Sequence, residues 1–196
     1  KMAEPHFKML WSQDIPRHVA TDAGGTQTEV ACIVGRLAGA DTAEPPAPPP
    51  DSWAAQPESD LAIWTLKMAP GARWTLPPAV GERTRRKLYF FKGQGVAIND
   101  QAVGRSAAIE LPAQQPTELA NGPGTSEFLL LQGRPIGEPV AQHGPFVMNT
   151  QQELQQAFAD YRRTAFGGWP WPDDAPVHGA ERQRFARHAD GQVERF

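Results

Sequence analysis

The sequence is poor in cysteine and carries no strong excess of charge. Cys32 is the single cysteine among 196 residues, so no disulfide can form within the chain. It lies in the apolar run VACIV, where we expect it to pack as a small hydrophobic residue. The formal net charge is only −3, which disfavours direct binding to the phosphate backbone of a nucleic acid.

Long hydrophobic runs are also absent. No apolar stretch reaches the ~20 residues that a transmembrane helix needs. The first residues lack the charged, then apolar, then small-residue layout of a secretory signal. These absences predict a cytoplasmic protein that does not bind membranes. Because the sequence starts at Lys1 rather than a methionine, we expect that an upstream segment precedes it.

Histidines are few, and their spacing excludes the common metal motifs. None of the five lies between His18 and His143, and no HxH, HExxH or HxxxH pair occurs. No serine occupies the strand-to-helix elbow of a hydrolase, and the glycines of GQG and NGPG lack the strand, loop and helix context of a phosphate-binding loop. The sequence therefore predicts no catalytic residue and no metal ligand in this chain.

Short apolar segments separated by turn residues dominate the sequence instead. Twenty prolines and eighteen glycines are scattered between them, which argues against a helical bundle. From residue 60 the strand-like segments recur at short intervals, a spacing typical of a β-sandwich or small barrel. They are 61–68, 72–76, 87–91, 95–98, 107–111 and 127–132, and an earlier one spans 28–37.

The region that follows this first strand-like segment is rich in proline. Five of the six residues from Pro45 to Pro50 are proline, which fixes the φ angle and removes backbone donors. We expect a stiff, extended connector on the surface. The alternative is that the segment is a PxxP ligand recognised by another protein.

One helix is clearly indicated after Thr150. This threonine and Glu153 fit a capping box, in which each side chain bonds to the backbone of the other residue. Gly167 and Gly168 are expected to end the helix, before an extended, loosely packed tail. An apolar stripe at helical spacing needs a surface to pack on, and its members are Leu154, Ala157, Phe158 and Tyr161.

Three segments carry a family resemblance, GRPIGEPVAQHGPFVMNT at 133–150, KMAEPHFKMLWSQDIP at 1–16 and LKMAPGARWTLPP at 66–78. Together they resemble the pirin family, whose members are bicupins with two cupin barrels in one chain. Segment 133–150 resembles the end of the second barrel, where a similar sequence leads into a closing helix. Segment 1–16 resembles the segment that leaves the first barrel, and segment 66–78 is similar as well. The resemblance implies an all-β fold, a cupin-type jelly-roll barrel or sandwich with one C-terminal α-helix and an extended tail.

Three regions follow from this resemblance and from the patterns above. Residues 1–55 are predicted to be a lead-in segment with one strand and the proline-rich connector. Residues 56–148 are predicted to form the C-terminal cupin barrel, and residues 149–196 the helix and the tail.

The metal-binding motif of cupins is similar to a glycine, five residues, His-x-His, a short spacer, and a glutamate that lies six residues before a second glycine. Placed on this sequence, the motif runs from Gly71 to Gly93. Pro77 and Ala79 then occupy the histidine positions, and Arg86 occupies the glutamate position. A guanidinium would repel a divalent cation and cannot lose its proton to avoid doing so. We therefore expect a metal-free barrel without a cofactor.

The resemblance implies that the chain is the carboxy-terminal cupin of a pirin-like protein and packs against an N-terminal cupin that holds iron or another divalent transition metal. The expected partner is that N-terminal half or a second copy of the chain, with a regulatory protein as a further partner. Two alternatives remain open. The longer protein is an oxidoreductase similar to quercetin dioxygenases, with its active site in the other half, or the barrel is a binding module for a small molecule or a protein.

Five residues are candidates for a pocket or an interface: Trp74, Arg86, Tyr89, Phe90 and His143. The aromatic residues either line a pocket for a planar ligand or fill the core. His143 either contacts the seam between domains or is a turn histidine bonded to the backbone. Strand parity places Arg86 and Phe90 on one face and Tyr89 on the other. The basic run at 83–87 is expected to be a solvated strand edge.

Overall fold

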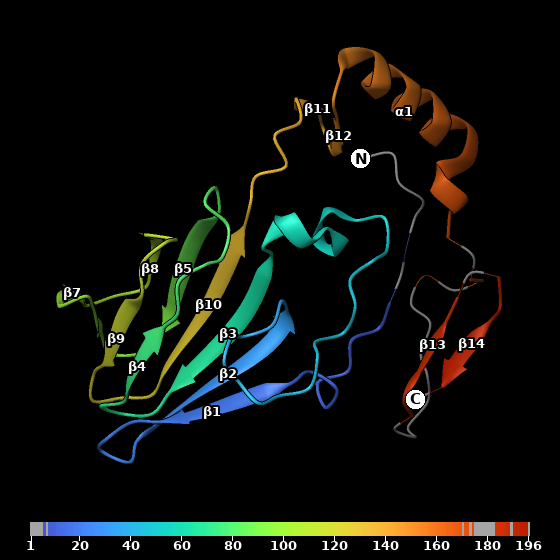
Figure 1. Cartoon of the computed structure of the whole chain (residues 1–196). Helices are drawn as coiled ribbons and strands as arrows, with labels where there is room; N and C mark the ends of the chain where they lie inside the picture. Colours follow the sequence, from blue (N-terminus) through green and yellow to red (C-terminus); the bar gives the residue numbers. More distant parts are fainter. Residues whose placement is uncertain are drawn as a thin grey trace. The chain divides into compact units, whose positions relative to one another are not determined.

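The computed structural model describes residues 6, 8–169, 171, 172, 174, 183–188 and 190–195. The chain divides into two compact units, one that ends at Ile136 and one that begins at Gly137 (Figure 1). The β-barrel belongs to the first unit and the long helix to the second.

The larger sheet of the first unit has six antiparallel strands in the order β1-β2-β3-β10-β5-β8. Strand β10 therefore pairs with both β3 and β5. The strands are β1 (Arg17–Thr21), β2 (Gln27–Val34), β3 (Ala62–Met68), β10 (Ser126–Gly133), β5 (Arg85–Lys92) and β8 (Ala107–Leu111). Two short 3-10 helices precede β3, η1 (Trp53–Ala55) and η2 (Pro57–Ser59).

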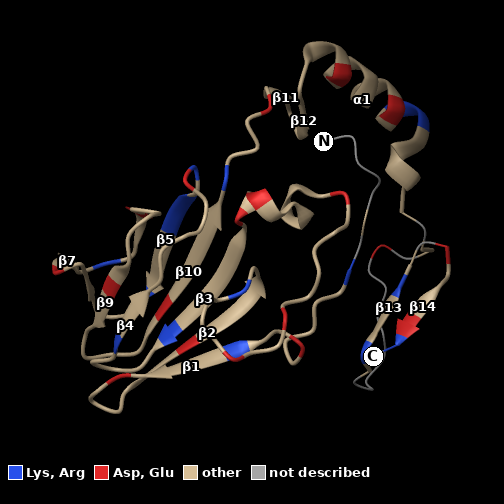
Figure 2. Ribbon diagram, in the orientation of Figure 1, with Lys and Arg blue, Asp and Glu red and all other residues tan. Residues whose placement is uncertain are grey.

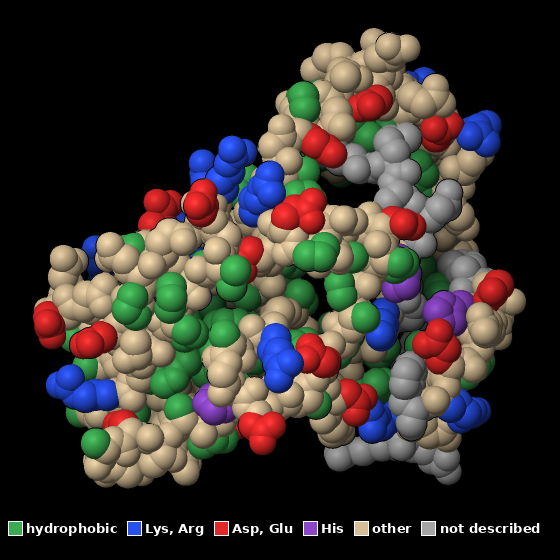
Figure 3. Space-filling model, in the orientation of Figure 1, with side chains coloured by type: hydrophobic (Ala, Val, Ile, Leu, Met, Phe, Trp, Pro, Cys, Tyr) green, Lys and Arg blue, Asp and Glu red, His purple; other side chains and the backbone are tan. Residues whose placement is uncertain are grey.

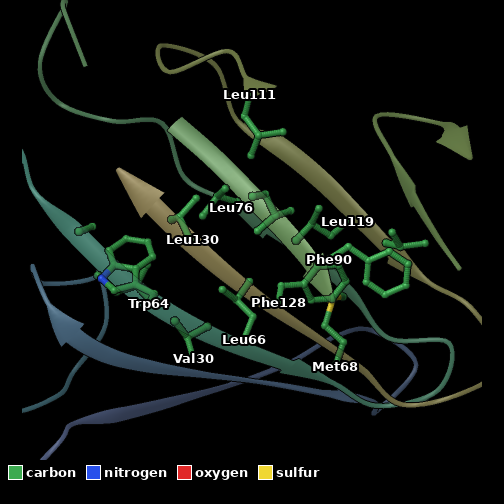
Figure 4. Close-up of a cluster of buried hydrophobic side chains, with 14 of the residues drawn as sticks. Val30, Trp64, Leu66, Met68, Leu76, Phe90, Leu111, Leu119, Phe128 and Leu130 are labelled. Carbon is green, nitrogen blue, oxygen red and sulfur yellow. The ribbon is translucent and has the colours of Figure 1, made fainter. Parts of the chain in front are cut away.

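A second sheet of four strands, in the order β4-β9-β6-β7, packs against the first. Its strands are β4 (Arg73–Leu76), β9 (Thr117–Asn121), β6 (Val96–Ile98) and β7 (Gln101–Val103). Side chains from both sheets point into one hydrophobic cluster (Figure 4). At its centre the rings of Phe90 and Phe128 stack with their centroids 5.1 Å apart. The predicted all-β cupin fold is confirmed, with a core that lies between the two sheets.

Burial alternates along the strands with a period of two, as a half-buried sheet requires. On β5, Arg86, Leu88 and Phe90 are buried, whereas Lys87 and Tyr89 between them are more exposed. The predicted parity of this strand is confirmed. Cys32 is also buried as expected, with 1% of its surface exposed, and burial raises the pKa of its thiol.

The lead-in region differs from its prediction. It contributes two strands instead of one, and both belong to the larger sheet because β2 pairs with β1 on one side and β3 on the other. Inward residues of β2, such as Val30, are part of the core. The proline-rich segment between β2 and β3 contains no strand or helix, as expected from its missing backbone donors.

The basic run at 83–87 is not a solvated strand edge. Strand β5 lies between β10 and β8, so it is an interior strand of the sheet. Figure 2 shows the basic start of β5 in blue. On this strand Arg86 is buried, with only 3% of its surface exposed. The charge of the run suggested a solvated face. The alternation of side chains along β5, however, makes the Arg86 side chain point into the barrel.

The second unit combines a hairpin with the predicted helix. Strands β11 (Ala141–His143) and β12 (Phe146–Met148) pair, and helix α1 (Gln151–Thr164) follows with the expected capping box between Thr150 and Glu153. The helix ends at Thr164, and its C-cap residue Ala165 has a left-handed conformation. A 3-10 helix, η3 (Ala165–Gly167), then continues to the predicted glycines. The tail expected to be extended carries a further hairpin, β13 (Phe185–Arg187) with β14 (Val193–Arg195).

The apolar stripe of α1 packs on the β11–β12 hairpin. Leu154 and Ala157 are buried, and the ring of Phe158 lies 4.6 Å from that of Phe146 on β12. Phe146 also contacts Tyr161 and Phe166, so the docking surface of the stripe is local. Within the part of the chain that the structure describes, this 14-residue helix and the 3-10 helices are all too short or too polar to span a membrane.

Candidate functional site

The inner face of the larger sheet carries buried polar side chains at both ends. Thr28 and Ser126 lie at one end, and at the other end two polar side chains face each other. Arg86 of β5 and Gln132 of β10 are register partners, and both point into the barrel. Only 3% of Arg86 and 8% of Gln132 is exposed. Next to them on the sheet lies Ala62 of β3, the other register partner of Gln132. The fold therefore buries two polar side chains, Arg86 and Gln132, at this end of the interior.

The guanidinium of Arg86 is held by two oxygen atoms. Its Nε donates to the side-chain oxygen of Gln132 at 2.6 Å, and its Nη1 donates to the carbonyl oxygen of Pro77 at 2.6 Å. Pro77 follows directly after β4, so the second bond connects the two sheets. Both acceptors are neutral, which leaves the guanidinium charge without a direct carboxylate contact.

Asp60 completes this polar cluster from the segment before β3. The amide nitrogen of Gln132 donates to the backbone oxygen of Asp60 at 3.0 Å and to its Oδ1 at 3.1 Å. The other carboxylate oxygen accepts from the Thr84 hydroxyl at 2.5 Å and from the Gly81 backbone at 2.9 Å. Gln132 therefore links the anion and the cation, and each of its two amide atoms is used.

Burial is the main electrostatic influence on Arg86. It lowers the pKa of the guanidinium, while the negative charge of Asp60 opposes this shift. An arginine nevertheless keeps its proton, because its ordinary pKa is far above neutral. The inner end of the barrel thus holds a permanent cation whose surroundings are mostly uncharged.

The residues present do not fit a divalent metal. Two of the three positions that the cupin motif aligns with metal ligands, Pro77 and Arg86, meet at the hydrogen bond described above. The carboxylate of Asp60 is already occupied by neutral donors, and a cation stands beside it. Among the described residues no group of three or more His, Cys, Asp or Glu side chains is arranged to hold a metal ion. The donor chemistry of this barrel therefore does not suit a metal.

A pocket of about 240 Å³ lies against this cluster. Its inner wall includes Arg86, Gln132 and Trp64, and the indole nitrogen of Trp64 is fixed by a 2.7 Å hydrogen bond to the carbonyl oxygen of Gly35. The rest of the lining mixes apolar residues, such as Ala55, Pro78 and Val80, with polar or charged ones, which are Arg36, Gln56, Ser59 and Asp60. The pocket therefore combines one buried cation with a lining that is apolar only in part.

The outer face of the same sheet carries an apolar patch, which consists of Ile63, Thr65, Leu129, Leu131 and Tyr89. Thr65, Leu129 and Tyr89 are consecutive register partners across β3, β10 and β5. Ion pairs flank the patch, Lys92 with Glu127 at 2.7 Å and Lys87 with Glu110 at 3.3 Å. Figure 3 shows one face of the molecule, on which hydrophobic side chains lie among charged ones. An apolar centre with a charged rim is typical of a protein interface.

The five candidate residues are not gathered at one site. Arg86 lines the pocket, whereas Phe90 is 2% exposed and fills the core. Trp74 is half-buried and packs against the core from β4, and Tyr89 belongs to the outer apolar patch. His143 lies in the second unit, where its ring contacts that of Phe158 edge-on at 5.5 Å.

The sequence patterns did not identify two residues of the polar cluster, Gln132 and Asp60. Gln132 ends the apolar run EFLLLQ, and its parity with Leu130 and Phe128 is the signal that could have placed it inside the barrel. Asp60 gave no such signal. Its position depends on a left-handed backbone conformation, with a φ of 46° at the end of η2, and on contacts distant in sequence.

Comparisons with known proteins find similar sequences and structures. Residues 63–167 match the model of a family described as the pirin C-terminal cupin domain. A pirin-like protein from Solanum lycopersicum is 33% identical over 171 residues, which cover 83% of this chain and 50% of that protein. Pirin from Homo sapiens is 30% identical over 171 residues, which cover 85% of this chain and 53% of the human protein.

Solved structures give a consistent result. A crystal structure of quercetin 2,3-dioxygenase from Acinetobacter baumannii is similar with a TM-score of 0.66 and 28% sequence identity. The similarity covers 85% of this chain and 52% of that one. The chain thus spans about half the length of the relatives that it matches.

Proposed function

The chain belongs to the family of pirin C-terminal cupin domains, and on this premise we propose that it is the metal-free, carboxy-terminal cupin of a pirin-like protein. Its role is to support an N-terminal cupin and to pack against it. That N-terminal cupin binds iron or another divalent transition metal, and chemistry belongs to it. The proposal agrees with the observation that about half of each matched relative lies outside the similarity.

The observation that carries the proposal is the buried guanidinium of Arg86. It stands where the cupin motif would place a ligand carboxylate, and it is bonded to Gln132 and Pro77. A fixed positive charge inside a barrel opposes the entry of a dication, and burial strengthens this repulsion because the local dielectric constant is low. At the position of a metal-ligand carboxylate, this barrel has a hydrogen-bond network of Arg86, Gln132 and Pro77.

The outer apolar patch supports a packing role. Leu131 is 38% exposed and Phe91, which extends from the same strand as Tyr89, is 51% exposed. Several of the neighbouring charges are already paired within the chain, as in the 2.7 Å contact between Arg17 and Glu29. A partner that covers this face gains apolar burial without leaving those charges unpaired. We assign the patch to the seam with the N-terminal cupin.

Elemental analysis tests the proposal. The purified 196-residue chain is expected to contain iron, nickel, manganese and copper far below stoichiometric amounts. The matched control is the longer pirin-like protein with both cupins, prepared in the same way, in which one transition metal per chain is expected. A stoichiometric metal in the shorter chain would contradict the proposal.

A second function is supported by the similarity to the quercetin 2,3-dioxygenase of A. baumannii. In this case the longer protein oxidises a flavonoid-like substrate in its N-terminal cupin, and this chain contributes structure. Oxygen consumption with quercetin would be measured on the longer protein. The activity should disappear on chelation and survive Arg86→Met, whereas an inactive but metal-loaded protein would favour the supporting role alone.

A further inference from the structure

The lining of the pocket beside Arg86 contains more charged residues than a purely structural hydrogen-bond network requires. The three charged residues are Arg36, Asp60 and Arg86. Arg36 is exposed and paired with Glu44 at 2.7 Å, so it belongs to the rim. Asp60 is engaged by Thr84, Gly81 and Gln132, as described above. The remaining charge, on Arg86, is the buried one, with only 3% of its surface exposed.

The guanidinium has unused donors. An arginine carries five N–H groups, of which Nε and Nη1 use one each for Gln132 and Pro77. Among the described residues no hydrogen-bond acceptor contacts Nη2. Three N–H groups, one on Nη1 and two on Nη2, therefore remain available to a carboxylate. A buried cation with only neutral acceptors also gains more from an anion than an exposed one would.

The apolar part of the lining restricts the kind of anion that the pocket can bind. Trp64, Ala62 and Ala79 are each buried and line the same pocket, and hydrocarbon packs on such surfaces whereas a bare oxyanion does not. The nearby carboxylate of Asp60 also disfavours a ligand with two negative charges. The volume of about 240 Å³ admits only a small molecule.

We propose that this pocket binds a small organic monocarboxylate, whose carboxylate pairs with Arg86 and whose hydrocarbon part packs against Trp64. The binding is reversible and needs no chemistry. It is a property of this chain alone, so it does not depend on an N-terminal cupin or on its metal.

Benzoate is a suitable probe, with benzamide as a neutral molecule of the same shape and inorganic phosphate as an anion without hydrocarbon. Thermal unfolding and isothermal calorimetry of the 196-residue chain would be followed against each compound. Benzoate is expected to raise the unfolding temperature saturably, and the indole N–H signal of Trp64 should shift in NMR spectra. Equal effects of benzamide, stronger effects of phosphate, or no saturable effect of benzoate would each overturn the proposal.

Variants locate the binding. Arg86→Lys keeps the charge but loses the planar pair of donors, and it is expected to weaken benzoate binding by about ten-fold to a hundred-fold. The matched control is Arg85→Gln, because Arg85 is exposed and does not line this pocket. Benzoate affinity unchanged in Arg86→Lys, or lost equally in Arg85→Gln, would overturn the assignment.

A second variant decides the result if Arg86→Lys fails to fold. Ala55 is half-buried in η1 and lines the pocket without contributing to the polar cluster. Ala55→Trp should fill the pocket from its rim, leave the fold intact and abolish the benzoate-induced shift. A full shift in a folded Ala55→Trp variant would place the bound benzoate elsewhere and overturn the proposal.

Discussion

The two faces of the six-stranded sheet both depart from the usual pattern of an apolar interior and a polar exterior. The inner face ends in a buried cation, Arg86, and the outer face has an apolar patch around Leu129. The inner departure is compensated within the chain, because Gln132 and Pro77 accept from the guanidinium. The outer departure has no such compensation among the described residues of the first unit. This difference supports the proposal that the outer face packs against a partner, whereas the inner cation is bonded within the chain.

The largest effect is expected at the apolar centre of the inner face. Phe128 is fully buried and stacks on Phe90, so Phe128→Ala should lower the free energy of unfolding by about 3–5 kcal/mol. Urea denaturation measures the change. Leu131→Ala is the control on the same strand, where 38% exposure predicts a loss of roughly 1 kcal/mol or less. Similar losses in the two variants would contradict the assignment of the core to the inner face.

The buried polar cluster should give the next largest effect. Gln132→Leu leaves the Arg86 Nε and an oxygen of Asp60 without their partner, and it is expected to cost about 2–4 kcal/mol. Adding Arg86→Met removes the buried charge, so the double variant should be more stable than Gln132→Leu alone. A double-mutant cycle in urea measures this coupling. Additive losses would mean that the two side chains act independently.

A charged substitution on the outer face should change self-association more than it changes the free energy of unfolding. The exposed patch predicts that the isolated chain self-associates at high concentration. Leu131→Glu is expected to shift light scattering towards the monomer while changing the free energy of unfolding by roughly 1 kcal/mol or less. Val80→Glu is the control, because Val80 is 86% exposed but lies in a loop away from the patch. A wild-type chain that stays monomeric at high concentration would contradict the prediction that the patch causes self-association.

The smallest effect concerns the turn between β1 and β2. The Thr26 hydroxyl, followed by backbone groups including the Arg73 N–H, lowers the pKa of Asp22 from 3.8 to about 2. Since the folded pKa is below the unfolded one, the stabilisation is present above about pH 4 and is lost as the pH falls towards 2. Above about pH 4 the Asp22→Asn variant should therefore melt at a lower temperature than the wild type. This difference in melting temperature should shrink as the pH falls towards 2. A difference independent of pH would show that ionisation of Asp22 does not matter.

Much of the fold could be predicted because its signals are local. Short apolar segments between turn residues located β3, β5 and β10, and the capping box located the start of α1. The second strand of the lead-in region was missed because β1, with the sequence RHVAT, is only half-buried and carries a weak apolar pattern. Its place in the sheet is set by pairing with β2, which a local pattern does not reveal.

The candidate site was harder to predict, because its residues come together through distant contacts. Arg86 was recognised as a misfit for a metal ligand, yet its positive charge suggested solvent exposure when the run at 83–87 was considered as a whole. Its partner Gln132 lies on β10, and Asp60 lies before β3. Only the pairing of β10 with both β3 and β5 places these three residues together.

The position of β10 also constrains how the barrel is made. It is the last strand of the first unit in the sequence, yet it occupies the interior of the larger sheet between β3 and β5. Before Ser126–Gly133 has been synthesised, the neighbouring sides of β3 and β5 have open hydrogen-bonding edges, and such edges template intermolecular pairing. Premature termination anywhere upstream of Ser126 is therefore expected to produce an aggregating polypeptide instead of a smaller folded domain.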